Sequence, residues 1–201
     1  MNLSTAALKR ALLVERESSF FRLRGGYPIP LAGAIWWACL GFAGLHLRHH
    51  DQWIMFAFYT SGLIFPLALL LARVTRNGFM QDRTAVSDAL FPAFASMLVF
   101  WPIAISAFRS YPELVPLILG IGMSVHWPVI GWMYGRTAIF TTHAVVRAIG
   151  CFVVWNWFPQ GRFTVLPFCV CGIYLVTVAA IAVASSDGYK ARWLRASAVT
   201  E

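Results

Sequence analysis

Successive runs of about twenty mostly apolar residues divide this sequence, and they constrain its fold more than any other feature. Each run is long enough to cross the hydrocarbon core of a bilayer as an α-helix. The fold class that follows is all-α, a polytopic membrane helical bundle with six transmembrane helices and an N-terminal amphipathic helix. The predicted spans cover residues 27–45, 52–71, 86–108, 112–134, 138–157 and 163–184.

The composition agrees with a membrane protein. Hydrophobic residues make up 59% of the chain and charged residues only 12%, whereas soluble domains carry about 25% charged residues. A net charge of +8 in a soluble protein would point to nucleic acid. Here the basic residues cluster between the apolar runs, where they set the orientation of the spans. The expected partner is therefore the lipid bilayer, and no nucleic acid is expected.

The basic residues also predict a topology. If the N-terminus lies in the cytoplasm, the inner segments hold twelve Lys and Arg residues and the outer loops hold three. Cytoplasmic loops carry an excess of positive charge, so both termini are expected to be cytoplasmic. We divide the chain into a cytoplasmic or interfacial amphipathic helix (1–26), a six-helix transmembrane domain (27–184) and a cytoplasmic tail (185–201). Residues 1–26 lack the uninterrupted apolar core of a signal peptide. The alternative to an interfacial helix in this segment is a fully solvated cytoplasmic helix.

Two further features concern the packing of the spans. Gly33, Gly41 and Gly44 give the first span a surface of small residues, which lets another helix approach closely. Pro66 lies inside the second span and removes one backbone hydrogen bond, so a kink is expected there.

Three ionisable residues lie within the fourth and fifth spans, and they form the candidate site. His143 and Arg147 are four residues apart and share a helix face, while His126 lies in the preceding span. The short turn at residues 135–137 makes the two helices antiparallel neighbours, which puts both imidazoles about 9–12 Å deep and Arg147 about 15 Å deep. An ionisable group at such depth marks a functional site by default. Further polar groups that we assign to this site are Ser124, Thr142 and Tyr134.

A structural interpretation of the same residues stays open. A membrane histidine often only bonds a carbonyl or hydroxyl group of a neighbouring helix. Arg147 needs a counter-charge, carbonyl groups or water, and Asp88 at the inner end of the third span is one acid within reach. An Arg147–Asp88 pair would lock the bundle without binding a ligand.

The function class that these residues favour is a small transporter or channel with an intramembrane His/Arg site for an anion or a polar small molecule. Because six spans are few for a transporter, a homo-oligomer is expected. The alternatives are a membrane-embedded enzyme or lipid- or metal-binding protein that uses the histidine pair, or a structural partner subunit.

The sequence favours a non-enzyme, and no catalytic residue is assigned. It contains no Gly-x-Ser-x-Gly elbow, no His-Glu-x-x-His zinc motif and no phosphate-binding loop. The spans also lack paired carboxylates for acid–base chemistry. The cofactor is left unknown, since a haem between His126 and His143 needs a wider gap than a tight hairpin leaves.

A second cluster lies in the first outer loop, where His46, His49 and His50 precede Asp51. Imidazole and carboxylate groups bind transition metals, so this loop is a candidate metal site. The adjacent His49 and His50 aim at one ion only if the loop bends, and a solvated polar loop is the alternative.

The run from Gly122 through His126 and Pro128 to Trp132 and Tyr134 resembles a recurring motif of small bacterial multi-pass membrane proteins. These proteins form an uncharacterised family, a domain of unknown function. The resemblance covers mainly the second to fifth spans. It implies a protein of the bacterial inner (cytoplasmic) membrane, and it supplies no function and no role for His143 or Arg147.

Overall fold

The computed structural model describes residues 4–78, 81–82, 84 and 86–186, and these residues fold into helices joined by short turns, without a β-strand among them. The predicted all-α class is confirmed. The helices are α1 (Thr5–Arg22), α2 (Pro28–His46), α3 (His50–Ser61), α4 (Ile64–Val74), α5 (Leu90–Met97), α6 (Trp101–Ser110), α7 (Val115–Gly122), α8 (Trp127–Met133), α9 (Thr137–Trp157) and α10 (Val165–Ala184). Short 3-10 turns are η1 (Arg24–Gly26), η2 (Ser87–Ala89), η3 (Leu98–Phe100), η4 (Pro112–Leu114) and η5 (Pro159–Gly161).

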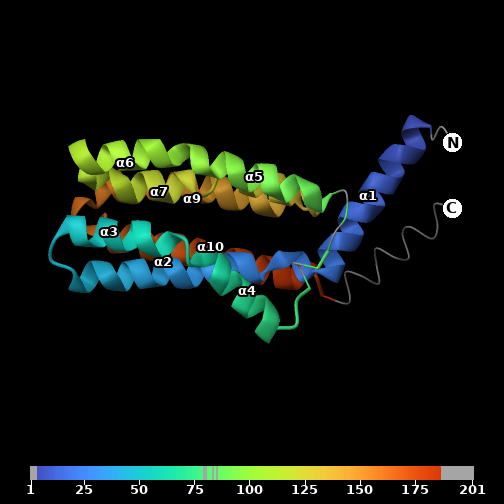
Figure 1. Ribbon diagram of the computed structural model, residues 1–201, viewed down its shortest axis with the longest axis horizontal. Coiled ribbons are helices and arrows are strands. Elements are labelled where there is room, and N and C mark those ends of the chain that lie inside the picture. Colours follow the sequence, from blue (N-terminus) through green and yellow to red (C-terminus); the bar gives the residue numbers. More distant parts are fainter. Residues whose placement is uncertain (1–3, 79–80, 83, 85, 187–201) are drawn as a thin grey trace.

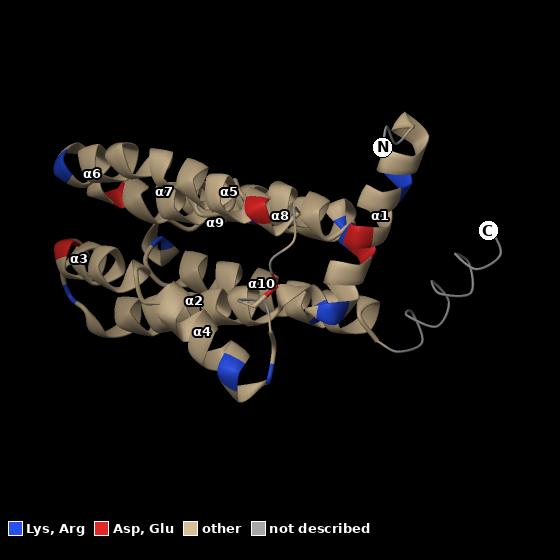
Figure 2. Cartoon of the chain, turned by 45° about the vertical axis from the view of Figure 1, so that its right-hand side comes forward, with Lys and Arg blue, Asp and Glu red and all other residues tan. Residues whose placement is uncertain are grey.

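The helices form two layers. Figures 1 and 2 show α5, α6, α7 and α9 in one layer and α2, α3, α4 and α10 in the other. Helix α10 packs along α2 in its own layer and against α9 in the other layer. The contact between α9 and α10 therefore joins the two layers. The site described below lies where these central helices meet.

Five helical stretches of 20 to 24 residues are long and apolar enough to cross a membrane within the described residues. The pair α3 and α4 meets the same criterion only when taken together, and these two helices are bent by 51° at the break between them, as in a broken span or a re-entrant loop. The chain is therefore a multi-pass membrane protein with five or six candidate spans, and the predicted number of six corresponds to counting the bent pair as one span.

The close packing of the first span has a defined partner. A Cβ atom on Gly33 would lie 2.8 Å from the ring of Tyr174, and one on Gly41 would lie 2.7 Å from Phe168. A Cβ atom on Gly44 would lie only 2.0 Å from the carbonyl oxygen of Phe163. The predicted small surface of α2 is thus confirmed, and α10 with the turn before it is the element that fills it.

Interruptions divide three of the spans, and a proline follows each of them. The bend between α3 and α4 precedes Pro66, which confirms the predicted kink. The 3-10 turn η3 precedes Pro102, and the turn at residues 123–126 between α7 and α8 precedes Pro128. Each proline lacks the N–H that would bond to the carbonyl four residues earlier, so helical bonding is weakest at these points. The predicted fourth span is consequently two short helices.

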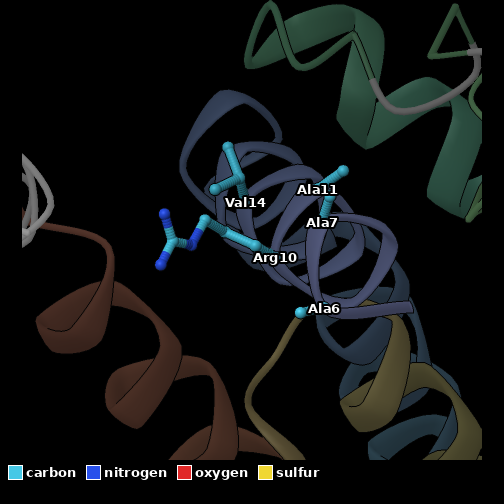
Figure 3. Close-up of a pocket in the computed structure, with 5 residues that line it drawn as sticks. All are labelled: Ala6, Ala7, Arg10, Ala11 and Val14. Atoms are coloured by element: carbon cyan, nitrogen blue, oxygen red, sulfur yellow. The ribbon is translucent and has the colours of Figure 1, made fainter. Parts of the chain in front are cut away.

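Among the described residues, the second half of helix α1 contacts the bundle and the first half is exposed. Phe20 is fully buried, and Arg136 forms an ion pair of 2.5 Å with Glu17. The first turns extend away from the bundle, and their side chains, including Leu8, are exposed. Figure 3 shows the short side chains along this part of the helix, with Arg10 reaching outward. The interfacial location of this helix stays a prediction, and residues 187–201 of the predicted tail lie outside the described residues.

Candidate functional site

A fully buried arginine lies at the centre of the site. Arg147 is 0% exposed, and its Nη1 donates a hydrogen bond of 2.7 Å to the hydroxyl oxygen of Tyr174 on α10. Its guanidinium carbon lies 5.2 Å from the ring centre of Trp37 on α2 and 5.0 Å from that of Tyr174. Two aromatic faces and one hydroxyl thus surround the cation, which helps to hold it inside the bundle.

The charge of Arg147 has no acidic partner in the described part of the chain. Its Nε and Nη2 atoms are buried without a hydrogen-bond acceptor, and the ion pairs of the structure all involve other arginines. Asp88, the acid considered from the sequence, is exposed in η2 and does not pair with Arg147. The predicted alternative of an Arg147–Asp88 lock is therefore not what the structure shows.

His143 lies one helical turn before Arg147 and is held by Thr177 of α10. The distance between its Nδ1 atom and the hydroxyl oxygen of Thr177 is 2.8 Å. The Thr177 hydroxyl itself donates to the carbonyl oxygen of Ile173, also at 2.8 Å, so we assign the bond proton to Nδ1 of the histidine. The other ring nitrogen, Nε2, is then a buried acceptor without a donor among the described residues.

His126 ends the turn between α7 and α8, and an aromatic ring separates it from His143. The ring centre of Trp127 lies 5.0 Å from that of His126 and 4.9 Å from that of His143. Tyr174 contacts the same group, with its ring centre 4.7 Å from that of His143. The structure therefore brings His126, His143 and Arg147 into one cluster, but through Trp127 and Tyr174 and not by direct contact between the imidazoles.

The remaining residues that were assigned to the site form no hydrogen bond with His126, His143 or Arg147 in the described structure. Ser124 is buried, but its hydroxyl donates to the carbonyl oxygen of Ile121 within the same turn. Thr142 is exposed on α9, where it lines a second cavity together with His143 and Thr177. Tyr134 packs with its ring centre 6.1 Å from that of Phe20, so it belongs to the contact between α1 and the bundle.

The outer histidines do not converge. His46 and His49 are exposed, and the ring of His50 stacks on Phe163 with the centres 4.0 Å apart. Within the described ranges no group of three His, Cys, Asp or Glu side chains is arranged to hold a metal ion. The metal site stays a prediction, without support from the positions of its imidazoles.

Sequence reasoning missed four members of the cluster, which are Trp37, Trp127, Tyr174 and Thr177. The last two are three residues apart in an otherwise apolar span, so they share a helix face. That pair of hydroxyl groups was the signal available in the sequence. The two tryptophans lie in the interior of the bundle and not at the ends of spans, where tryptophan is usually found.

A cavity of about 430 Å³ lies beside the cluster. His126 and Tyr174 line it together with residues of α2, α4, α5, η3 and α6. All three interrupted spans contribute to its wall, because Gly62, Leu98 and Met123 from their break regions are lining residues. Arg147 is not among the lining residues, but Tyr174, which accepts its hydrogen bond, is one of them.

Fold and site together define a multi-pass helical membrane protein with a buried His/Arg cluster beside an intramembrane cavity. The chain belongs to a family of unknown function, DUF7010, whose family model matches residues 15–184. The family resemblance seen in the sequence is thereby confirmed. No curated protein and no solved structure matches the chain.

Proposed function

We propose that this protein is a small transporter for an anion, or for a polar molecule that carries an anionic group, and that Arg147 anchors the negative charge. The observation that carries the proposal is the fully buried guanidinium with two N–H-bearing nitrogens that lack acceptors among the described residues. A cation within a bilayer costs at least about 2.5–3.5 kcal/mol and is normally paired. A bound anion would supply the missing partner.

The other unpartnered groups of the cluster also fit an anion. The indole nitrogens of Trp37 and Trp127 are buried without an acceptor in the described part of the structure. The hydroxyl oxygen of Tyr174 accepts from Arg147, which leaves its own proton to be donated. The cluster thus has a surplus of donors, and a carboxylate or phosphate group offers several acceptor oxygens.

The interrupted spans support transport more than fixed binding. Transporters typically form their sites near the midplane from discontinuous helices. Here the break regions of three spans line one cavity beside the cluster. Changes in the bends at Pro66, Pro102 and Pro128 would move the cavity walls relative to α9 and α10, which carry the arginine and its partner.

Flux into proteoliposomes tests this proposal. Vesicles with purified protein are assayed with radiolabelled phosphate, sulfate, acetate and lactate as probes. We expect uptake of at least one probe, its loss in Arg147→Gln, and wild-type uptake in Arg109→Gln, which changes an exposed arginine at the end of α6. Equal fluxes in all three proteins and in empty vesicles would contradict the proposal.

A membrane-embedded enzyme is the second candidate, and one observation favours it. His143 is oriented by Thr177 so that Nε2 is an unprotonated, buried nitrogen, which is the form a general base requires. Such an enzyme would lose turnover in His143→Gln while it keeps ligand binding. A transporter would lose both anion binding and anion uptake in Arg147→Gln.

A further inference from the structure

The cavity beside the cluster is apolar except on one side. Ser61 lines it, but its hydroxyl is already bonded to the carbonyl oxygen of Phe58 at 2.8 Å. The buried polar side-chain groups left for a ligand are the unpartnered Nδ1 of His126, the unpartnered indole nitrogen of Trp127 and the hydroxyl of Tyr174. His126 is only 5% exposed and Tyr174 only 4% exposed, so these groups lie deep in the protein. A ligand would therefore place one polar end there and an apolar remainder along the rest of the wall.

The cavity is bordered by residues that face lipid. Phe65 on α4 and Phe91 on α5 line it, yet they are 46% and 80% exposed. These helices belong to different layers, and the 51° bend turns α4 out of line with α3 (Figures 1 and 2). Exposed residues of a span contact hydrocarbon, so a ligand can reach the cavity sideways from the bilayer between α4 and α5.

We infer that the substrate is a single-chain amphipathic anion taken from the bilayer, an inference that rests on the proposed anion site at Arg147. Its apolar chain lies between α4 and α5, and its head group meets His126 and Tyr174, with the charge of Arg147 directly behind the hydroxyl. The cavity of about 430 Å³ is near the lower end of the about 300–1,000 Å³ typical of small-molecule sites. It therefore fits one chain and not a two-chain lipid.

Photo-labelling with a diazirine derivative of palmitate tests this inference. Protein in lipid nanodiscs is labelled, digested and analysed by mass spectrometry. We expect label on the peptides that contain Phe65 and Phe91, competition by palmitate, and weak competition by hexadecanol, which has the same chain without the charge. Label spread evenly over the lipid-facing helices, or equal competition by both compounds, would overturn the inference.

A pair of matched variants locates the label. Ala95 is an exposed residue of α5 that lines the cavity, whereas Val99 is an exposed residue of η3 that does not. Ala95→Trp should reduce cavity labelling about tenfold, because the ring occupies the cavity. Val99→Trp should leave the labelling unchanged. Both variants add the same side chain to a lipid-exposed position, so a difference between them cannot be a general effect on folding.

Small anions separate this inference from the proposal on which it rests. Stabilisation by acetate or phosphate depends on Arg147 and should persist in Ala95→Trp. If small anions stabilise the protein and palmitate does not label the cavity, the amphipathic substrate is ruled out and the anion site stands. Cavity labelling that is as strong in Arg147→Gln as in wild type would remove the head-group assignment.

Discussion

The guanidinium Nη1 of Arg147 donates a 2.7 Å hydrogen bond to the hydroxyl of Tyr174, and this bond joins the two central helices α9 and α10. Within the described residues, the Nε and Nη2 atoms of the same side chain have no hydrogen-bond partner. The arginine is consequently held in place but not satisfied, as the proposed role of a ligand anchor requires.

Removal of this hydroxyl should destabilise the protein. Tyr174→Phe keeps the ring but leaves Arg147 without its acceptor, and an unsatisfied buried polar group costs about 1–3 kcal/mol. We expect a lower melting temperature in detergent. Tyr59→Phe is the control, because Tyr59 is 77% exposed on α3. Equal melting temperatures for the two variants would show that the bond contributes nothing to stability.

The orientation of His143 should depend on Thr177. Thr177→Val removes the acceptor of the Nδ1–H group at similar side-chain volume, and we expect a loss of about 1–3 kcal/mol of stability. Thr177→Ser keeps a hydroxyl and should restore most of it. Chemical denaturation monitored by tryptophan fluorescence measures the free energy of unfolding of the two variants. No rescue by serine would mean that packing, not the hydrogen bond, makes this position sensitive.

Two glycines should respond in opposite ways to the same change. Gly44→Ala places a Cβ atom 2.0 Å from a backbone oxygen, so the helices must shift, at a cost of about 1–3 kcal/mol. Gly172→Ala meets no atom within 4 Å and should leave stability unchanged or raise it by up to about 1 kcal/mol through helix propensity. Melting temperatures of the two variants test the contact between α2 and α10. A similar change in melting temperature for both variants would contradict this contact.

The attachment of α1 should depend on Arg136. Its guanidinium pairs with Glu17 and lies 4.7 Å from the ring centre of Phe20. Both charged side chains are mostly buried, at 17% and 19% exposure, so Glu17→Gln should weaken the contact by about 1.5–3 kcal/mol. Hydrogen exchange of residues 15–26 should then become faster, with Arg10→Gln as the exposed control. Unchanged exchange would show that the apolar contact of Phe20 is sufficient.

The fold could largely be predicted from the lengths of the apolar runs. The tight hairpin before α9 is also confirmed, and Gly135 provides its positive φ of 62°. The division of the fourth span into α7 and α8 was not foreseen. A proline predicts a weakened helix, but whether the helix bends or breaks depends on the packing around it, which periodicity does not reveal.

The candidate site could be predicted only in part. The spacing of His143 and Arg147 correctly predicted a shared helix face, and both residues are buried there. Their hydrogen-bond partners come from α10, more than twenty residues away in the chain, and no local pattern pairs them. Tyr134 was assigned to the site from the sequence, yet its ring packs near that of Phe20 on α1.

The most direct test of the account is whether anions stabilise the protein through Arg147. Melting temperatures of purified protein are measured with phosphate, sulfate, acetate and palmitate between about pH 5 and 8. The account predicts a rise for wild type with at least one anion, and loss of that rise in both His143→Ala and Arg147→Ala. A panel that leaves the wild-type melting temperature unchanged throughout this range would contradict it, and would favour a structural partner subunit.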